Sequence, residues 1–269
     1  MQSTDEMNIN MGNSVSTLLL RSGLWDVGIQ WAGFAVAAAL KTEKFYDLAG
    51  SGTFLFLAIQ TLRWGNTFYF RQKVQTGMVA TWAVRLGLFL FTRVLQAGGD
   101  SRFDKVKHNP KTFFVYWTIQ ALWVWLTLLP TMILNSEKRD KPLGLRDYAG
   151  WGLWTAGFLL EAVADYQKTV FKADPDNAGK FISTGLWSIS RHPNYLGEIL
   201  LWAGLYLSSS SVMSGYQHLS VISPIFVYLL LTRISGVPIL ERQGMKRYGK
   251  DPAYLDYVKN TALLLPGFW

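Results

Sequence analysis

The sequence predicts an all-α integral membrane protein, a polytopic bundle of about seven transmembrane helices. Half of the 269 residues are hydrophobic and only 16% are charged. The apolar residues fall in long runs separated by short basic loops, the pattern that a hydrocarbon layer about 30 Å thick imposes on a chain. Many of the twelve Trp lie near the ends of these runs, where amphipathic rings prefer the headgroup region. We therefore expect one transmembrane domain over residues 1–269.

Four uncharged or nearly uncharged runs predict the first four spans. The run 112–136 holds 25 consecutive uncharged residues, and a membrane bundle tolerates Pro130 near its end because neighbouring groups satisfy the freed carbonyl. Another run, 74–92, is interrupted by a single charge, Arg85. The expected spans are residues 24–40, 48–62, 74–92 and 112–136.

A fifth span begins near Tyr148 and continues through Glu161 and Asp165, so its far end must face protein, cofactor or water rather than lipid. Residues 199–232 lack Asp, Glu, Lys and Arg, and the serine-rich stretch near residue 210 splits this run into two spans.

The two ends of the chain have a different composition. Residues 237–269 alternate apolar and charged positions and predict an interfacial cytosolic segment. Residues 1–14 form a polar tail without the features of a cleaved signal peptide.

Basic residues in short loops predict the orientation, with the N-terminus outside and the C-terminus in the cytosol. The loops at 98–111 and 168–191 are rich in Lys and Arg, whereas 208–215 has neither. The loop at 137–146, with four basic residues on the expected outer side, is the exception. The expected location is the endoplasmic reticulum membrane in a eukaryote or the inner membrane in a bacterium.

The formal net charge of +8 does not indicate nucleic-acid binding, because Lys and Arg are scattered among the loops rather than gathered in one stripe. Anionic membrane lipids or a phosphorylated cofactor explain these charges better. The absence of cysteine excludes thiol catalysis, and the three histidines lack metal-ligand spacing, so we expect no metal site.

Four charged residues at the end of the fifth span are spaced four, three and four, which places them on one helix face. They are Glu161, Asp165, Lys168 and Lys172. They form either a salt-bridge ladder at the membrane surface or one wall of a cofactor site. In a cofactor site, Asp165 would accept hydrogen bonds from a ribose or amide and the lysines would meet phosphates.

The stretch 185–198 is the densest polar segment beside an apolar run. Pro193 suits the first position of a helix, so His192 is the expected cap, and the free amides that follow form an anion site beside Arg191.

Asn194, Glu198 and Trp202 then repeat at four-residue steps on one face. An amide and a carboxylate one turn apart suit recognition of a nicotinamide or ribose; the alternative is an interfacial anchor.

Arg85 lies midway along its span, where a guanidinium needs an acid or a phosphate. Its candidate partners are Asp47, Glu161 and Asp165, and a purely structural ion pair is the alternative. Arg102 lies in the next loop, which is either a phosphate-binding element or a solvated turn.

These residues carry a family resemblance. Residues 185–187, the run 190–198 and Trp202 resemble the C-terminal signature of the steroid 5-alpha-reductase superfamily, and the likeness is greatest to its DUF1295 branch. Residues 165–168 are similar to the acidic patch of that superfamily, and 100–104 resembles a DUF1295 loop.

The resemblance implies a seven-helix fold, NADPH entering from the cytosolic side, and a lipid or sterol-like substrate whose activated carbon–carbon double bond is reduced. Carried over by motif, Asp165, Asn194 and Glu198 would hold NADPH. The supporting residues would be Arg85, Arg102, Lys168, Lys172, Arg191, His192 and Tyr195.

In the steroid reductases a glutamate before the second span and a tyrosine in the third polarise the substrate carbonyl. Here Trp82 stands at the position of the tyrosine, three residues before Arg85, and Asp47 is the nearby acid. The implied catalytic residues are Asp47, Trp82 and Arg85. An indole N–H donates a hydrogen bond but cannot deliver a proton, whereas a desolvated, neutral Asp47 could act as a donor.

Two other functions fit the same architecture. The isoprenylcysteine methyltransferases are similar in their Arg-His-Pro helix start and in a stretch like 241–257, and they use S-adenosylmethionine instead of NADPH. A non-catalytic lipid-binding membrane protein would also retain the spans.

Overall fold

The computed structural model describes residues 14–265, without the side chain at position 101. Its helices are α2 (Val15–Leu40), α3 (Tyr46–Gly65), α4 (Phe70–Ala97), α5 (Pro110–Ser136), α6 (Leu145–Ala173), α7 (Pro193–Ser209), α8 (Ile222–Leu229), α9 (Gly236–Tyr248) and α10 (Pro252–Asn260). Short 3-10 turns cover Ser101–Phe103, Pro175–Asn177, Gly185–Ser188 and Gly215–Val221. The prediction of an all-α membrane bundle is confirmed.

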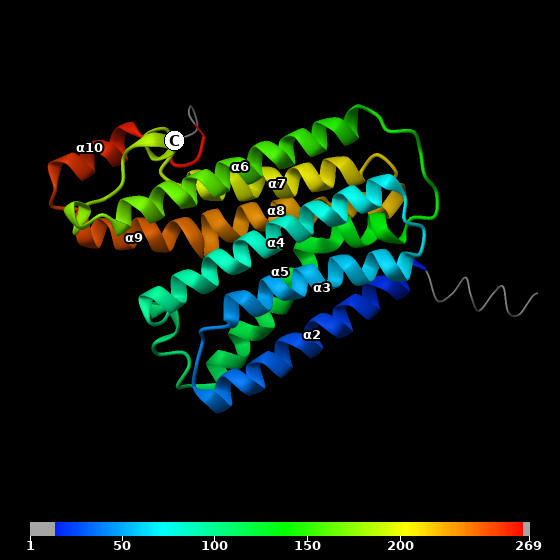
Figure 1. Cartoon of the computed structure of the whole chain (residues 1–269), viewed down its shortest axis with the longest axis horizontal. Helices are drawn as coiled ribbons and strands as arrows, with labels where there is room; N and C mark the ends of the chain where they lie inside the picture. The colour runs from blue at the N-terminus through cyan, green and yellow to red at the C-terminus, as the bar shows by residue number, and fades with distance from the viewer. Residues whose placement is uncertain (1–13, 266–269) are drawn as a thin grey trace, which may run out of the picture. The chain divides into compact units, whose positions relative to one another are not determined.

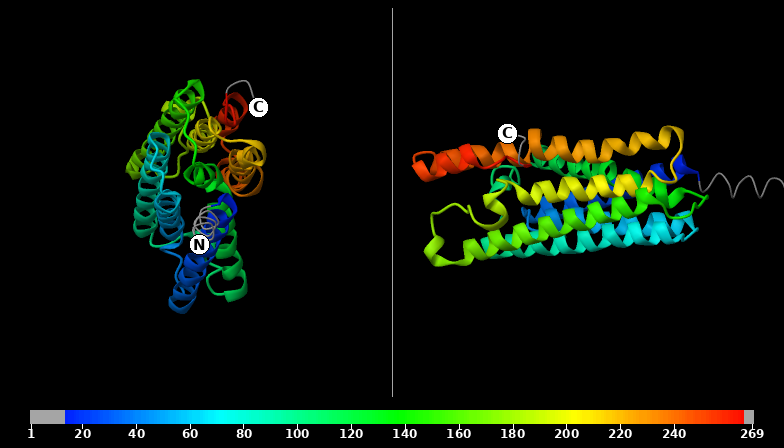
Figure 2. Two further views of the ribbon diagram at one scale, coloured as in Figure 1. Left: turned by 90° about the vertical axis from the view of Figure 1, so that its right-hand side faces the viewer. Right: turned by 90° about the horizontal axis from the view of Figure 1, so that it is seen from above.

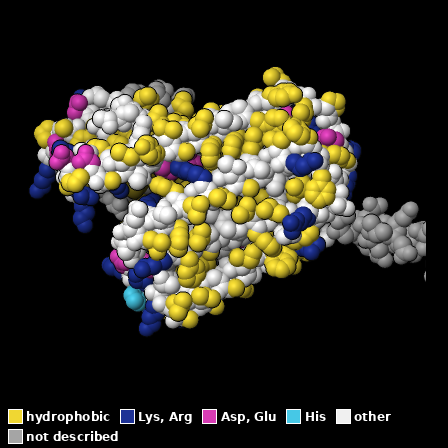
Figure 3. All heavy atoms as spheres, viewed as in Figure 1, with side chains coloured by type: hydrophobic (Ala, Val, Ile, Leu, Met, Phe, Trp, Pro, Cys, Tyr) yellow, Lys and Arg dark blue, Asp and Glu magenta, His cyan; other side chains and the backbone are white. Residues whose placement is uncertain are grey.

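Within the part of the chain that the structure describes, four helical stretches are long and apolar enough to cross a membrane by length and composition. They are Val15–Leu40, Phe70–Ala97, Pro110–Ser136 and Gly215–Tyr248. Hydrophobic side chains are spread over much of the face drawn in Figure 3. The count of seven spans and the orientation stay predictions.

The described chain packs as two compact units. Unit 1 comprises residues up to Asp147 together with Ser209–Ser223, and unit 2 comprises Tyr148–Ser208 and the residues from Pro224 onward. Compact packing units are not the same as domains, so one domain over residues 1–269 stays a prediction. Most of the expected polar tail lies outside the described residues, but Ser14 caps α2 by accepting a hydrogen bond from the Thr17 amide, 3.2 Å away.

In unit 1, α3 lies between α2 and α4, and α5 packs across α2 and α3 (Figure 1). Pro130 lies inside α5 without ending it, as expected. Small residues permit close approach: a methyl group at Gly33 of α2 would lie 2.5 Å from the Trp117 ring of α5. Membrane helices, which gain little from hydrophobic burial against each other, associate through such tight contacts.

A buried ion pair closes one end of unit 1. The Arg71 guanidinium, at the start of α4, binds Asp147 through Nε at 2.5 Å and Asp140 through Nη1 at 2.5 Å. Arg71 and Asp147 are almost fully buried. The loop with four basic residues therefore also supplies one carboxylate, Asp140, to an interior cation, and α6 supplies the other, Asp147.

In unit 2, α6 and α7 lie side by side, and α8 continues through a π-helical turn, Leu230–Ile234, into α9 (Figure 2). Glycines at seven-residue intervals form the contact between α6 and α7. A methyl group at Gly157 would lie 2.5 Å from the Gly197 carbonyl oxygen, and one at Gly150 would lie 2.6 Å from that of Gly204. This close packing brings the polar ends of the two helices together.

Candidate functional site

The turn before α7 is hydrogen-bonded to α6. Gly185 has φ +60°, a left-handed conformation that favours glycine, and the Gln167 amide occupies the place that a Cβ would fill. The Gln167 side-chain oxygen accepts a hydrogen bond from the Leu186 amide at 2.9 Å, and the Trp187 indole donates to the Ala164 carbonyl at 3.0 Å. These bonds fix the direction in which Arg191 and His192 leave the turn.

Arg191 and His192 share one acid, Glu241 of α9. Arg191 Nη1 lies 2.5 Å from one carboxylate oxygen of Glu241, and His192 Nε2 lies 2.8 Å from the other. The His192 ring stacks on Tyr195 with centroids 5.6 Å apart. Burial lowers the pKa of His192, and the hydrogen bond with Glu241 offsets this only in part. The expected start of α7 at Pro193 is confirmed.

A pocket of about 280 Å³ opens beside this cluster, entirely within unit 2. Its charged lining contains five cations and one carboxylate: Lys168, Lys172, Lys180, Arg191, Arg247 and Glu241. The remaining walls are largely aromatic: Phe171, Phe181, Trp187, Tyr248, Tyr254 and Tyr257. Such a lining attracts an anion and offers rings for stacking a planar group.

The C-terminal helices form one side of the pocket. The Tyr248 hydroxyl donates to the Lys180 carbonyl at 3.0 Å, and the Tyr257 hydroxyl donates to the Trp187 carbonyl at 2.7 Å. Phe181 lies against Tyr254 with ring centroids 5.0 Å apart. The predicted interfacial segment thus forms part of a pocket wall.

The charged face of α6 that contains Asp165 meets the face of α7 that contains Asn194. The Asn194 amide donates to Asp165 at 3.1 Å, and Asp165 is buried. Lys168 lies over the Trp187 ring, 4.3 Å from its centroid. Glu198 is partly buried on α7, one turn beyond Asn194. Unit 2 therefore gathers Asp165, Lys168, Lys172, Arg191, His192, Asn194, Tyr195 and Glu198.

The other predicted site residues belong to unit 1. Arg102 Nη2 lies 3.0 Å from Asp47, at the start of α3, and 2.5 Å from Asp100. Trp82 is buried in α4 against Phe54, with ring centroids 5.0 Å apart.

The guanidinium of Arg85 lies 5.2 Å from the ring centroid of Phe89, one turn along the same helix. Among the side-chain contacts of the three predicted catalytic residues, Asp47 meets Arg102 and Arg93, Trp82 meets Phe54, and Arg85 meets Phe89. Their proposed roles stay predictions.

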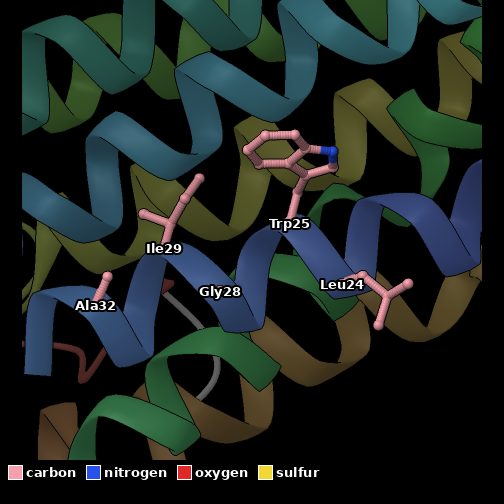
Figure 4. Close-up of a pocket in the computed structure, with 5 residues that line it drawn as sticks. All are labelled: Leu24, Trp25, Gly28, Ile29 and Ala32. Carbon is pink, nitrogen blue, oxygen red and sulfur yellow. The ribbon is translucent and has the colours of Figure 1, made fainter.

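A second hollow lies on the surface of α2 and is lined only by Leu24, Trp25, Gly28, Ile29 and Ala32 (Figure 4). It contains no charged group, so it suits an acyl chain but not a cofactor. The basic pocket of unit 2 is the better candidate site.

Sequence reasoning did not single out Glu241, Lys180 or Arg247 as site residues. The alternation of charged and apolar positions around Glu241 was interpreted as an interfacial helix. The available signal was the repeated aromatic–basic pairing in the tail, as at Arg247 and Tyr248, which lie in the pocket wall.

Comparison with known protein families gives a match over residues 33–261 to "Protein of unknown function (DUF1295)". This chain belongs to the DUF1295 family. The expected branch is confirmed, and the match includes both the α6–α7 site and most of the helices of unit 1.

Curated relatives of this DUF1295 protein are distant and carry different names. A probable O-methyltransferase, ustE, of Ustilaginoidea virens is 32% identical over 103 residues, covering 38% of this chain and 34% of the relative. A probable 7-dehydrocholesterol reductase of Acanthamoeba polyphaga mimivirus is 27% identical over 112 residues, 35% of this chain and 23% of the relative. The 3-oxo-5-alpha-steroid 4-dehydrogenase 1 of Macaca fascicularis is 36% identical over 63 residues, 23% of this chain and 24% of the relative.

These matches span from about a quarter to a third of the relatives' lengths. No solved structure matches the chain.

Proposed function

We propose that this DUF1295 protein is a membrane-embedded reductase that uses NADPH to reduce an activated carbon–carbon double bond in a steroid-like or other lipid substrate. The similarity to two proteins named as sterol or steroid enzymes supports a reductase of such substrates. The charge of the unit 2 pocket is the observation that carries the choice of cofactor.

Five cations and one carboxylate surround a space of about 280 Å³, just below the usual range for ligand pockets. NADPH carries a pyrophosphate and a 2′-phosphate, so its phosphate-bearing end suits these cations and the aromatic walls suit its adenine. S-adenosylmethionine carries no phosphate and has a cationic sulfonium, which gains nothing from such a lining. The pocket therefore favours NADPH over S-adenosylmethionine.

The buried polar end of α6 and α7 suits the remainder of the cofactor. The Asn194 side-chain nitrogen donates to the Asp165 carboxylate at 3.1 Å, Asn194 also carries an amide carbonyl, and Glu198 adds a second carboxylate one turn on. These acceptors would hold ribose hydroxyls or a carboxamide. When bound, NADPH supplies the hydride for the reduction.

Activation of the substrate carbonyl is assigned to Asp47, with Trp82 and Arg85 in support. The Asp47 carboxylate lies 3.0 Å from Arg102 and 3.9 Å from Arg93, so these guanidinium groups would have to move away before Asp47 could polarise a substrate carbonyl. Trp82 would donate its indole N–H. The hydride adds to one carbon of the double bond, and the other carbon takes up a proton. This proton must come from another group, because an indole does not release one.

The choice of cofactor is tested by titrating the detergent-purified protein with NADPH, NADH and S-adenosylmethionine. We expect NADPH to bind most tightly. Arg247→Ala should weaken NADPH binding about tenfold and NADH binding less, since a charge-assisted phosphate contact contributes roughly 1.5–3 kcal/mol. Arg242→Ala is the matched control, because Arg242 lies on the same helix and does not line the pocket.

The α7 carboxylate gives a second test. Glu198→Ala should weaken NADPH binding roughly ten- to hundredfold through the loss of charge-assisted hydrogen bonds while the protein stays monodisperse. Wild-type protein that binds S-adenosylmethionine and ignores NADPH would support the methyltransferase that one relative's name suggests. A protein that binds neither would support a non-catalytic lipid-binding role.

A further inference from the structure

A buried carboxyl group in unit 1 has no role in the proposed reduction. Asp26 lies in the middle of α2, a helix long and apolar enough to span the membrane, and is only 1% exposed. It belongs to a stripe of buried residues at four-residue steps, with Ser22 before it and Gln30 after it. This stripe faces the interior of unit 1, on the side of α2 away from the apolar hollow around Gly28.

The neighbours of Asp26 on this stripe form hydrogen bonds with their polar side-chain groups. The Ser22 hydroxyl donates to the Leu18 carbonyl at 2.7 Å. Gln30 donates to Thr53 of α3 at 3.0 Å and accepts from Gln120 of α5 at 2.8 Å. These bonds show that the stripe lies against α3 and α5.

Asp26 differs from them, because neither of its carboxyl oxygens has a hydrogen-bond partner among the residues that the structure describes. The charged side chains of the three packed helices lie elsewhere. Arg21 of α2 places its guanidinium over an indole ring 4.0 Å away. Asp47 and Arg63 lie in the first and last turns of α3, and Lys111 lies in the first turn of α5.

An ionised carboxylate without a counter-charge or a donor is the least favourable group that a membrane interior can hold. The neutral acid is much less costly, and its hydroxyl can bond a backbone carbonyl of its own helix. Unit 1 can therefore keep α2 packed against α3 and α5 only while Asp26 holds a proton.

We propose that Asp26 is a proton-binding site in the interior of unit 1, and that its protonation is a condition for the packing of α2 against α3 and α5. The ligand is a proton from solvent, taken up as the helices pack. Ionisation places an unpaired charge in this contact and loosens α2. The inference does not depend on the proposed reductase activity, because it concerns a residue that has no part in cofactor or substrate binding.

Infrared spectroscopy of the full-length protein in detergent tests the protonation state directly. Wild-type protein at neutral pH should show the carbonyl stretch of a protonated carboxylic acid, and Asp26→Asn should lack it. Glu43→Gln is the matched control: Glu43 is 4% exposed but paired with Lys107 at 3.1 Å, so its loss should leave the band unchanged. A band that survives in Asp26→Asn would overturn the proposal.

Stability gives an independent readout. As pH rises, the unfolded chain can ionise Asp26 while the folded protein must keep it protonated, so wild type loses stability and Asp26→Asn does not. The melting temperature of Asp26→Asn should therefore exceed that of wild type by a margin that grows between acidic and neutral pH. A margin independent of pH would contradict the proposal.

If Asp26→Asn does not fold, Asp26→Glu replaces it, combined with carbonyl-labelled aspartate. The band should shift on labelling in wild type and become insensitive to the label in Asp26→Glu. A wild-type spectrum without the band would also refute the proposal.

Discussion

The carboxylate of Glu241 joins α9 to the turn before α7 within unit 2, so its charge should matter for stability. It bonds Arg191 at 2.5 Å and His192 at 2.8 Å, from the turn before α7. The Glu241 side chain is 26% exposed and that of Arg191 is 14% exposed. Glu241→Gln keeps the shape of the side chain and removes its charge, so the change isolates the electrostatic part of this contact.

The expected loss follows from these two bonds. A hydrogen bond to a charged group contributes about 1.5–3 kcal/mol and a neutral one about 0.5–1.5 kcal/mol. Glu241→Gln removes the negative charge from both contacts and leaves the Arg191 cation facing a neutral amide, so it should lower the free energy of unfolding by about 2–3 kcal/mol. Partial exposure keeps this below the roughly 3–5 kcal/mol expected when a fully buried ion pair is broken.

A double-mutant cycle with Arg191→Gln measures this interaction. Unfolding is followed by tryptophan fluorescence in mixed micelles, and we expect a coupling energy of about 1.5–3 kcal/mol. Asp256→Asn is the control, since this acid lies on the exposed side of α10 and its removal should cost less than about 0.5 kcal/mol. A coupling energy below about 0.5 kcal/mol would refute the reasoning.

Three further outcomes are expected. Gly157→Ala should destabilise the α6–α7 contact by about 1–3 kcal/mol in thermal unfolding, whereas Gly152→Ala, on the same helix with no atom within 4 Å of its added methyl group, should be neutral or stabilising. In assays of turnover and NADPH binding, Asp47→Asn should reduce turnover far more than cofactor affinity, and normal turnover would show that another group polarises the substrate. Burial alone would raise the pKa of Glu43, but hydrogen bonds from the Asp100 amide and Lys107 outweigh it and hold the pKa below its ordinary value. The stability from Glu43 is therefore fully present above its ordinary pKa and lost as pH falls through the lower folded-state pKa. The melting temperature of Glu43→Gln should accordingly converge on that of wild type in acid.

Helix positions were largely predictable because hydrophobic runs are a local property. The expected run 112–136 corresponds to α5, Pro110–Ser136, within two residues. The first run was expected from residue 24, but α2 begins at Val15, because Ser14 caps it and the Arg21 guanidinium stacks on an indole instead of ending the helix. Charge alone was therefore a poor guide to where a helix begins.

Part of the site was also predictable. The four-residue spacing of Asn194 and Glu198 and the acidic face of α6 are visible in the sequence, and the structure brings Asn194 to Asp165 at 3.1 Å. Periodicity indicates which residues share a face of one helix. It does not indicate which face of another helix they will meet, and here the glycine contacts between α6 and α7 decide this.

The sequence by itself determined the all-α membrane class, the approximate limits of the helices and the family to which the chain belongs. Only the tertiary structure decided that Glu241 pairs with Arg191 and His192, that Arg247 lines a basic pocket, and that Asp26 is buried with no hydrogen-bond partner among residues 14–265. The physical reason is that hydrophobicity and helix periodicity act between near neighbours in the chain. Ion pairs and desolvation instead depend on distances between segments that lie far apart in the sequence.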